Sequence, residues 1–199
     1  MSIFIQRYSA WTDEKNMPKL SFVPMLFRRR LSDLSKMVAY VAHDVSEGFS
    51  PAPMTFASEF GEIQRQFQIS SGILDSGEVS PAKFSLSVFN APIAAASIIE
   101  SNMTGYSAIF SGKRSFEDGL REAASALLSG RESERIFVFA DERIPETYSE
   151  ISPYPNPVCA LALRLSTEQS DSVCELELST LPEKDTAAEQ ALYFLEHFL

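Results

Sequence analysis

Cysteine and histidine are scarce in this chain of 199 residues, which has two of each. Cys159 and Cys174 are too few for a disulfide framework, and both fall in apolar, strand-like runs. We therefore expect two buried thiols in a protein from a reducing compartment. The two histidines, His43 and His197, lie far from each other and from the cysteines, so no ligand spacing for a metal ion is present.

Motifs of several common catalytic sites are absent as well. The sequence has no G-x-G-x-x-G or Walker-type loop to hold a nucleotide phosphate, and no serine lies in a G-x-S-x-G elbow. Asp141 and Glu142 follow a strand-like run and have the chemistry of an acid–base pair or of cation ligands. Carboxylates at strand ends are usually solvated, and we expect these two to be solvated. The sequence thus predicts no cofactor.

No run approaches the ~20 apolar residues of a membrane span. Residues 92–99 are apolar, but Glu100 ends the run. Residues 1–15 lack the basic region and the continuous apolar stretch of a signal peptide. We therefore expect a cytoplasmic protein without a membrane span.

Positive charge is also limited, because 17 Lys and Arg residues face 27 Asp and Glu residues, for a formal net charge of -10. A nucleic-acid-binding protein needs a basic face that displaces counterions, so we expect no nucleic-acid partner. The one basic cluster is Arg28–Arg30. It is an anchor for an acidic partner or, more commonly, an exposed helix start.

What the sequence does contain is an alternating α/β pattern, in a length that suits one domain over residues 1–199. Apolar periodicity and turn residues predict helices over 31–42, 63–76, 90–101, 115–127 and 187–198. Ser115 and Asp118 resemble a capping pair at the start of the fourth helix. The helix over 90–101 is apolar nearly all round and must be buried on every side, which suggests a partner over one face.

Predicted strands cover 3–8, 54–58, 105–110, 135–141, 157–166 and 172–179. The run over 135–141 is continuously apolar and is typical of a central strand. The last two runs are expected to form a hairpin through the polar loop 167–171. Residues Glu142–Asn156 are expected to form a long surface loop.

The stretch from Gly105 to Leu127 is predicted to be a strand, a tight turn and a helix, with Phe110–Lys113 in the turn. Many acyl-transferring enzymes place a nucleophile in such a turn, because the helix N-terminus offers unpaired N–H groups and a positive dipole end. This turn has no cysteine. Its serine, Ser111, needs a nearby base to become nucleophilic, and His43 is the only interior candidate.

Four blocks in order resemble the beta-ketoacyl synthase family, and more closely its short relatives that keep only the N-terminal half of the fold. The blocks are Arg28–Ser32, Phe56–Glu62, Ser80–Ala91 and Ser115–Ala123. The resemblance implies an α/β protein with half of a thiolase-like fold, in which helices flank a mixed sheet. Counting back from Gly119, Ser111 falls where the family has its nucleophilic cysteine, and Phe89 stands where short relatives usually carry histidine.

The resemblance also implies an interface. In the family's fold the strand before the nucleophile turn lies at a sheet edge and pairs across a two-fold dimer axis; here that strand is residues 106–110. The helix after Asn90 flanks the same interface. The expected interface and tunnel residues are Phe89, Asn90, Met103, Tyr106 and Phe110. Ordinary burial in the core is the alternative for Phe89, Met103 and Phe110.

A chain-length factor is the function that these features imply. Such a subunit lacks a catalytic residue of its own, pairs with a full-length ketosynthase as a heterodimer, and shapes the tunnel for acyl chains that an acyl carrier protein delivers. Fatty-acid-like, aryl polyene and polyketide elongation all stay open. A homodimer through the same edge, an acyl-binding monomer, and a serine-based acyltransferase or hydrolase that uses Ser111 are the alternatives.

Overall fold

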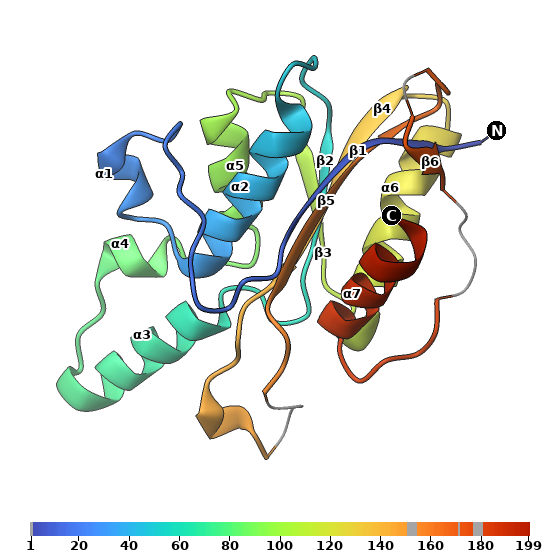
Figure 1. Ribbon diagram of the computed structural model, residues 1–199. Coiled ribbons are helices and arrows are strands. Elements are labelled where there is room, and N and C mark those ends of the chain that lie inside the picture. The colour runs from blue at the N-terminus through green and yellow to red at the C-terminus, as the bar shows by residue number, and fades with distance from the viewer. Residues whose placement is uncertain (1, 151–154, 171, 177–180) are drawn as a thin grey trace.

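The computed structural model describes residues 2–150, 155–170, 172–176 and 181–199. In these residues six strands form one mixed sheet in the order β3-β2-β4-β5-β1-β6 (Figure 1). The strands are β1 (Phe4–Trp11), β2 (Met54–Ala57), β3 (Tyr106–Ile109), β4 (Glu134–Asp141), β5 (Cys159–Ser166) and β6 (Cys174–Glu175). β2 is parallel to both β3 and β4, whereas β5 is antiparallel to both β4 and β1, and β6 is antiparallel to β1.

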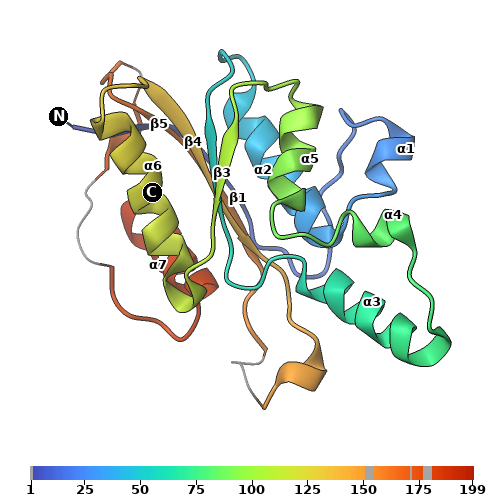
Figure 2. The same cartoon turned by 180° about the vertical axis from the view of Figure 1, so that it is seen from behind.

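Helices cover both faces of this sheet, so the fold has three layers (Figures 1 and 2). The helices are α1 (Met25–Arg28), α2 (Asp33–Ser46), α3 (Ile63–Ser76), α4 (Pro81–Phe84), α5 (Ala91–Ile99), α6 (Ser115–Leu128) and α7 (Ala187–Phe198), with 3-10 turns at Gly112–Arg114 and Glu146–Tyr148. α2 and α5 pack on one face, and α6 and α7 on the other. α1, α3 and α4 project on the side of α2 and α5 (Figure 1). No helix of the described residues is both long and apolar enough to cross a membrane.

The core follows from strand geometry, since successive side chains of a strand point to opposite faces. In β4, Phe137 and Phe139 pack toward α6 and α7, while Ile136 and Val138 pack toward α2 and α5. All four side chains are fully buried. The continuous apolar run of this strand is therefore the signature of a strand covered on both faces, as the sequence predicts.

A glycine sets how closely α6 lies to the sheet. A Cβ at Gly119 would lie 2.6 Å from Ala57 Cβ and 2.9 Å from Phe137 Cε2. We expect Gly119→Ala to lower the free energy of unfolding by about 1–3 kcal/mol, because the helix must move away from β2 and β4. Gly72→Ala in α3 is the matched control, since nothing lies within 4 Å of its Cβ position. Urea unfolding of both variants tests this, and equal stability of Gly119→Ala and the parent chain would contradict it.

The predicted helices and strands are present, with the differences that follow. α2 continues to Ser46, so His43 lies inside its last turn. β6 pairs with β1 and not with β5, so the predicted hairpin is wrong; β1 inserts between the two strands, which a local pattern does not reveal. Residues 171 and 177–179 of that prediction lie outside the described residues. In the single chain Ile98 of α5 is 66% exposed, and a partner over this face of the helix stays a prediction.

The last differences concern the long loop and the thiols. The loop after β4 is exposed along Glu146–Glu150, but both its ends are buried, because Asn156 accepts from the N–H of Ile144 (2.8 Å) and donates to the carbonyl of Glu142 (2.9 Å). Its residues 151–154 are outside the described residues. Cys159 is buried as expected, whereas Cys174 is only partly buried.

Candidate functional site

The edge strand β3 is the first part of the candidate site. In the described residues it pairs only with β2, so the backbone groups along its other side have no partner strand. Tyr106 and Ala108 on this strand are exposed, whereas Ser107 and Ile109 are half-buried. Ser107 turns inward and donates from Oγ to Thr55 Oγ1 (3.2 Å). The predicted edge position is confirmed.

Apolar side chains border this free edge at both ends. Met103 in the link before β3 is 94% exposed, and Phe110 directly after the strand is 66% exposed. Ordinary burial in the core is thus excluded for Met103 and Phe110. Exposed apolar residues that gather around one strand indicate a surface that binds another protein.

Two of the predicted interface residues connect this edge to the core. The Phe89 ring lies 5.6 Å from the ring of Phe56, which is buried, and 5.7 Å from the ring of Phe110. Gly61 makes room for Phe89, because a Cβ there would lie 2.9 Å from Phe89 Cδ2. Asn90 precedes α5 and donates from Nδ2 to the hydroxyl of Tyr106 (3.1 Å). The structure therefore brings Phe89, Asn90, Tyr106 and Phe110 together.

The turn that holds Ser111 is the second part of the candidate site. Ser111 is exposed, and its backbone N–H donates to Ser115 Oγ (3.0 Å). The predicted capping pair is therefore wrong. A 3-10 turn over Gly112–Arg114 precedes α6, so Ser115 lies inside the helix and makes no cap hydrogen bond, while Asp118 pairs with Arg114 (2.8 Å).

Neither histidine supplies a base to Ser111. His43 Nδ1 lies 2.9 Å from Glu100 Oε1, and its ring stacks on Phe22 with centroids 3.6 Å apart. His197 is exposed and its Nδ1 lies 2.9 Å from the carbonyl of Tyr193. Both histidines therefore make local contacts in the described residues, and the arrangement of a serine hydrolase is not formed there.

A buried carboxylate lies at the end of β4, next to the loop that follows β2. Asp141 Oδ1 accepts from the hydroxyl of Ser58 (2.6 Å) and from the backbone N–H groups of Glu59 and Phe60 (both 3.0 Å). Asp141 is fully buried, so the expected solvation is wrong. Burial raises its pKa to about 7, although these three donors stabilise the charged form. Its hydrogen bonds hold the loop over 58–62 against the sheet.

Glu142 and Glu62 are two further buried carboxylates in this part of the structure. Glu142 Oε1 accepts from the backbone N–H of Gln64 at the start of α3 (3.2 Å), and Glu62 Oε1 accepts from the hydroxyls of Ser32 (2.6 Å) and Ser35 (2.8 Å). Burial, with the charge of Glu62 nearby, raises the pKa of Glu142 to about 8. These carboxylates join the starts of α2 and α3 to the end of β4. The expectation that Glu142 is solvated is therefore also wrong, because its side chain is buried.

Sequence reasoning named Asp141 and Glu142 but missed Glu59 and Glu62. The signal was available, because two carboxylates in the run 58–62 directly follow the buried strand β2. Glu59 Oε2 accepts from the N–H of Ala187 at the start of α7 (2.7 Å). Within the described residues, no group of three or more His, Cys, Asp and Glu side chains is arranged to hold a metal ion.

Several solved structures have a similar fold. A ketosynthase in complex with its chain length factor from Xenorhabdus doucetiae matches with a TM-score of 0.73 at 22% identity, over 85% of this chain and 81% of that chain. The ishigamide ketosynthase/chain length factor matches with a TM-score of 0.66 at 11% identity, over 85% of this chain and 63% of that one. These TM-scores show a shared thiolase-like fold, in which helices flank a mixed sheet.

One chain of a third structure also matches. That structure is a type II PKS acyl-carrier protein in complex with its ketosynthase bound to the hexaketide, and the match has a TM-score of 0.73 at 11% identity, over 88% of this chain and 67% of the matched chain. No curated protein is significantly similar in sequence. The profile described as "Beta-ketoacyl synthase, N-terminal domain" matches residues 5–197, which is nearly the whole chain. The chain therefore belongs to the beta-ketoacyl synthase family.

Proposed function

We propose that this chain is a non-catalytic ketosynthase-like subunit of the chain-length-factor type, which pairs with a full-length ketosynthase through β3. The free edge of β3 carries this proposal. An edge strand with unpaired backbone groups is a template for pairing with another strand, and the exposed Met103 and Phe110 beside it lose their contact with water when a partner covers them. The complexes among the similar structures support a ketosynthase as the partner.

The partner supplies the condensation chemistry in this proposal. Ser111 replaces the nucleophilic thiol at the turn before α6, and in the described residues it has no histidine partner. We therefore assign residues 1–199 the role of one ketosynthase-like N-terminal domain that completes a cytoplasmic heterodimer. A homodimer through the same edge is the alternative assembly.

The side chains next to β3 define the second role that we propose. Phe89, Met103 and Phe110 are bulky, and in the pair they project toward the acyl tunnel of the partner and limit its depth. The substrates are acyl chains of fatty-acid-like, aryl polyene or polyketide elongation, attached to an acyl carrier protein. The carrier is strongly acidic as a rule, so a chain with a net charge of -10 leaves its docking to the partner.

Co-expression with a full-length ketosynthase from the same genome tests the pairing, with masses measured by light scattering. We expect a one-to-one complex, and we expect Ser111→Ala to leave this complex intact, because the substitution changes the exposed turn alone.

In the same complex, Met103→Ala is expected to shift the products to longer chains, because it removes an exposed side chain without disturbing the core. A chain that stays monomeric with every ketosynthase offered would overturn the proposal.

A further inference from the structure

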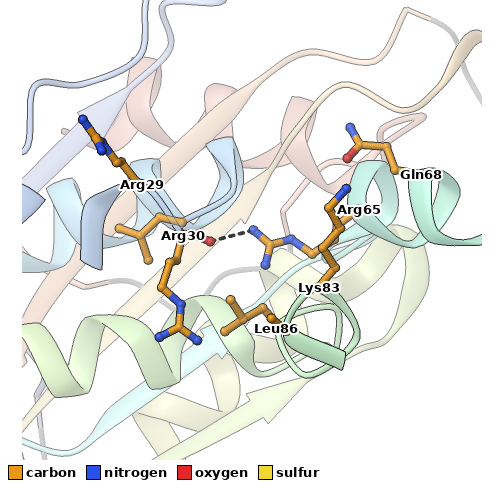
Figure 3. Close-up of a pocket in the computed structure, with 8 residues that line it drawn as sticks. Arg29, Arg30, Arg65, Gln68, Lys83 and Leu86 are labelled. Carbon is orange, nitrogen blue, oxygen red and sulfur yellow. Dashed lines mark hydrogen bonds between the residues drawn. The ribbon is translucent and has the colours of Figure 1, made fainter. Parts of the chain in front are cut away.

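Three separate segments form a basic pocket that no residue of β3 lines (Figure 3). Arg29 and Arg30 come from the link between α1 and α2, Arg65 from α3 and Lys83 from α4. Leu86 and Gln68 complete much of the wall around a cavity of about 250 Å³. Four of the 17 basic residues of an acidic chain thus line one cavity.

Arg65 is held in place at the centre of this pocket. Its Nε lies 3.2 Å from Glu62 Oε2, and one terminal nitrogen donates to the carbonyl of Arg30 (3.1 Å), as the dashed line in Figure 3 marks. The side chain of Arg65 is largely buried. Glu62 also accepts from two serine hydroxyls at the start of α2, so this carboxylate lies on the inner side of the pocket.

The other three cations have no such counterion. In the described residues, neither Arg29, Arg30 nor Lys83 forms an ion pair. Like charges around a small cavity repel one another, and a bound anion removes this repulsion. Phosphate suits the set best, because its oxygens accept paired N–H bonds from arginine forks and a point-charge contact from lysine.

An apolar groove continues from the pocket along α5. It has a volume of about 310 Å³ and shares Arg30, Leu31 and Leu86 with the basic pocket. The rest of its wall is mainly apolar and comes from Phe27, Val88, Ala91, Ala94, Ala95 and Ile98, with the polar Ser85 and Asn90. A ligand that fills both spaces carries an anionic group at one end and an apolar chain at the other.

We propose that this composite site binds a phosphate ester, with its phosphate between Arg30, Arg65 and Lys83 and its apolar chain in the groove along α5. A lipid headgroup and a soluble phosphate ester share this chemistry. The charged residues of the site come from elements other than β3, whereas its groove also reaches Asn90, which donates to Tyr106 on the edge strand.

Titration calorimetry at about pH 7.5, where a phosphate monoester carries close to two charges and inorganic phosphate somewhat fewer, tests the site with octyl phosphate and with inorganic phosphate. We expect octyl phosphate to bind about tenfold or more tightly than inorganic phosphate, because burial of each methylene group contributes to affinity. The double variant Arg30→Gln/Lys83→Gln weakens both ligands about tenfold or more. Val88→Ser weakens octyl phosphate alone, since Val88 lines only the groove.

The matched control is Lys15→Gln/Arg131→Gln, which makes the same change of net charge at two exposed positions outside the site. We expect it to bind both ligands as the parent chain does. Equal losses in the control and in the Arg30/Lys83 variant would overturn the proposal, as would a response to an acidic peptide with none to either phosphate. Circular dichroism checks folding, and Lys83→Gln alone, at an exposed position, serves if the double variant is unfolded.

Sedimentation with phosphatidylcholine vesicles that contain phosphatidic acid separates the two sources of the ester. Protein in the pellet, lost in the Arg30/Lys83 variant, identifies a membrane lipid, and protein in the supernatant identifies a soluble ester. The same variant still pairs with the ketosynthase, so loss of phosphate binding and loss of pairing are separate results.

Discussion

We expect Tyr106→Asp to abolish the proposed pairing of this chain with a ketosynthase. Tyr106 lies on the free edge of β3, is 39% exposed and does not belong to the buried core, so within the chain the substitution removes the hydrogen bond with Asn90 and the packing of the covered part of the ring. In the complex, however, the new carboxylate is buried at the interface without a partner, which costs several kcal/mol. We expect the dissociation constant to rise about 100-fold or more.

The opposite edge of the sheet offers a matched control. Val173 adjoins β6, its N–H donates to the carbonyl of Ile5 (2.7 Å), and its side chain is 52% exposed. Val173→Asp therefore introduces the same charge at the far side of the sheet and is expected to leave the complex intact. Light scattering of each variant mixed with the ketosynthase shows whether the complex forms. If Tyr106→Asp pairs as well as Val173→Asp does, the interface does not lie at β3.

We expect the stability of the protein to fall as the pH rises from 6 to about 8.5, with most of this loss due to Glu142. In the unfolded chain Glu142 ionises near 4.5, whereas in the folded chain its pKa is about 8. Between these values the folded state holds a proton that the unfolded state has released. Stability is therefore fully present below pH 4.5, is lost as the pH rises to about 8, and is constant above that.

Asp141 adds a smaller share in this window, because its folded pKa is about 7 and its ordinary value is 3.8. Each proton changes the free energy of unfolding by about 1.4 kcal/mol per pH unit. The parent chain is thus expected to lose on the order of 4 kcal/mol between pH 6 and 8.5, and Glu142→Gln on the order of 1 kcal/mol. The glutamine keeps a carbonyl oxygen for the N–H of Gln64.

Urea unfolding at several pH values measures this difference, with Glu146→Gln, at an exposed position of the following loop, as the control. The control should follow the parent chain. An unchanged pH dependence in Glu142→Gln would mean that Glu142 is ionised in the folded protein, and that its contact with α3 is a charged cap.

Local patterns predicted most elements correctly, because helices and buried strands are recognised by a periodicity that a few neighbouring residues carry. β4 is the clearest case, since its unbroken apolar run matches a strand covered on both faces. The edge position of β3 came from the family resemblance and is confirmed. The predicted pairing of β5 with β6 was wrong, because it depended on a distant segment. β1, from the start of the chain, lies between these two strands.

The features of the candidate site can likewise be separated into those that the sequence determined and those that only the structure decided. The sequence alone determined that the turn before α6 has a serine and no thiol, and that the chain is acidic overall. Only the tertiary structure decided that Asp141 and Glu142 are buried and that Arg65 and Lys83 join Arg29 and Arg30 around one cavity. Residue type and periodicity are properties of the chain, whereas burial and charge clustering depend on contacts between residues that are far apart in sequence.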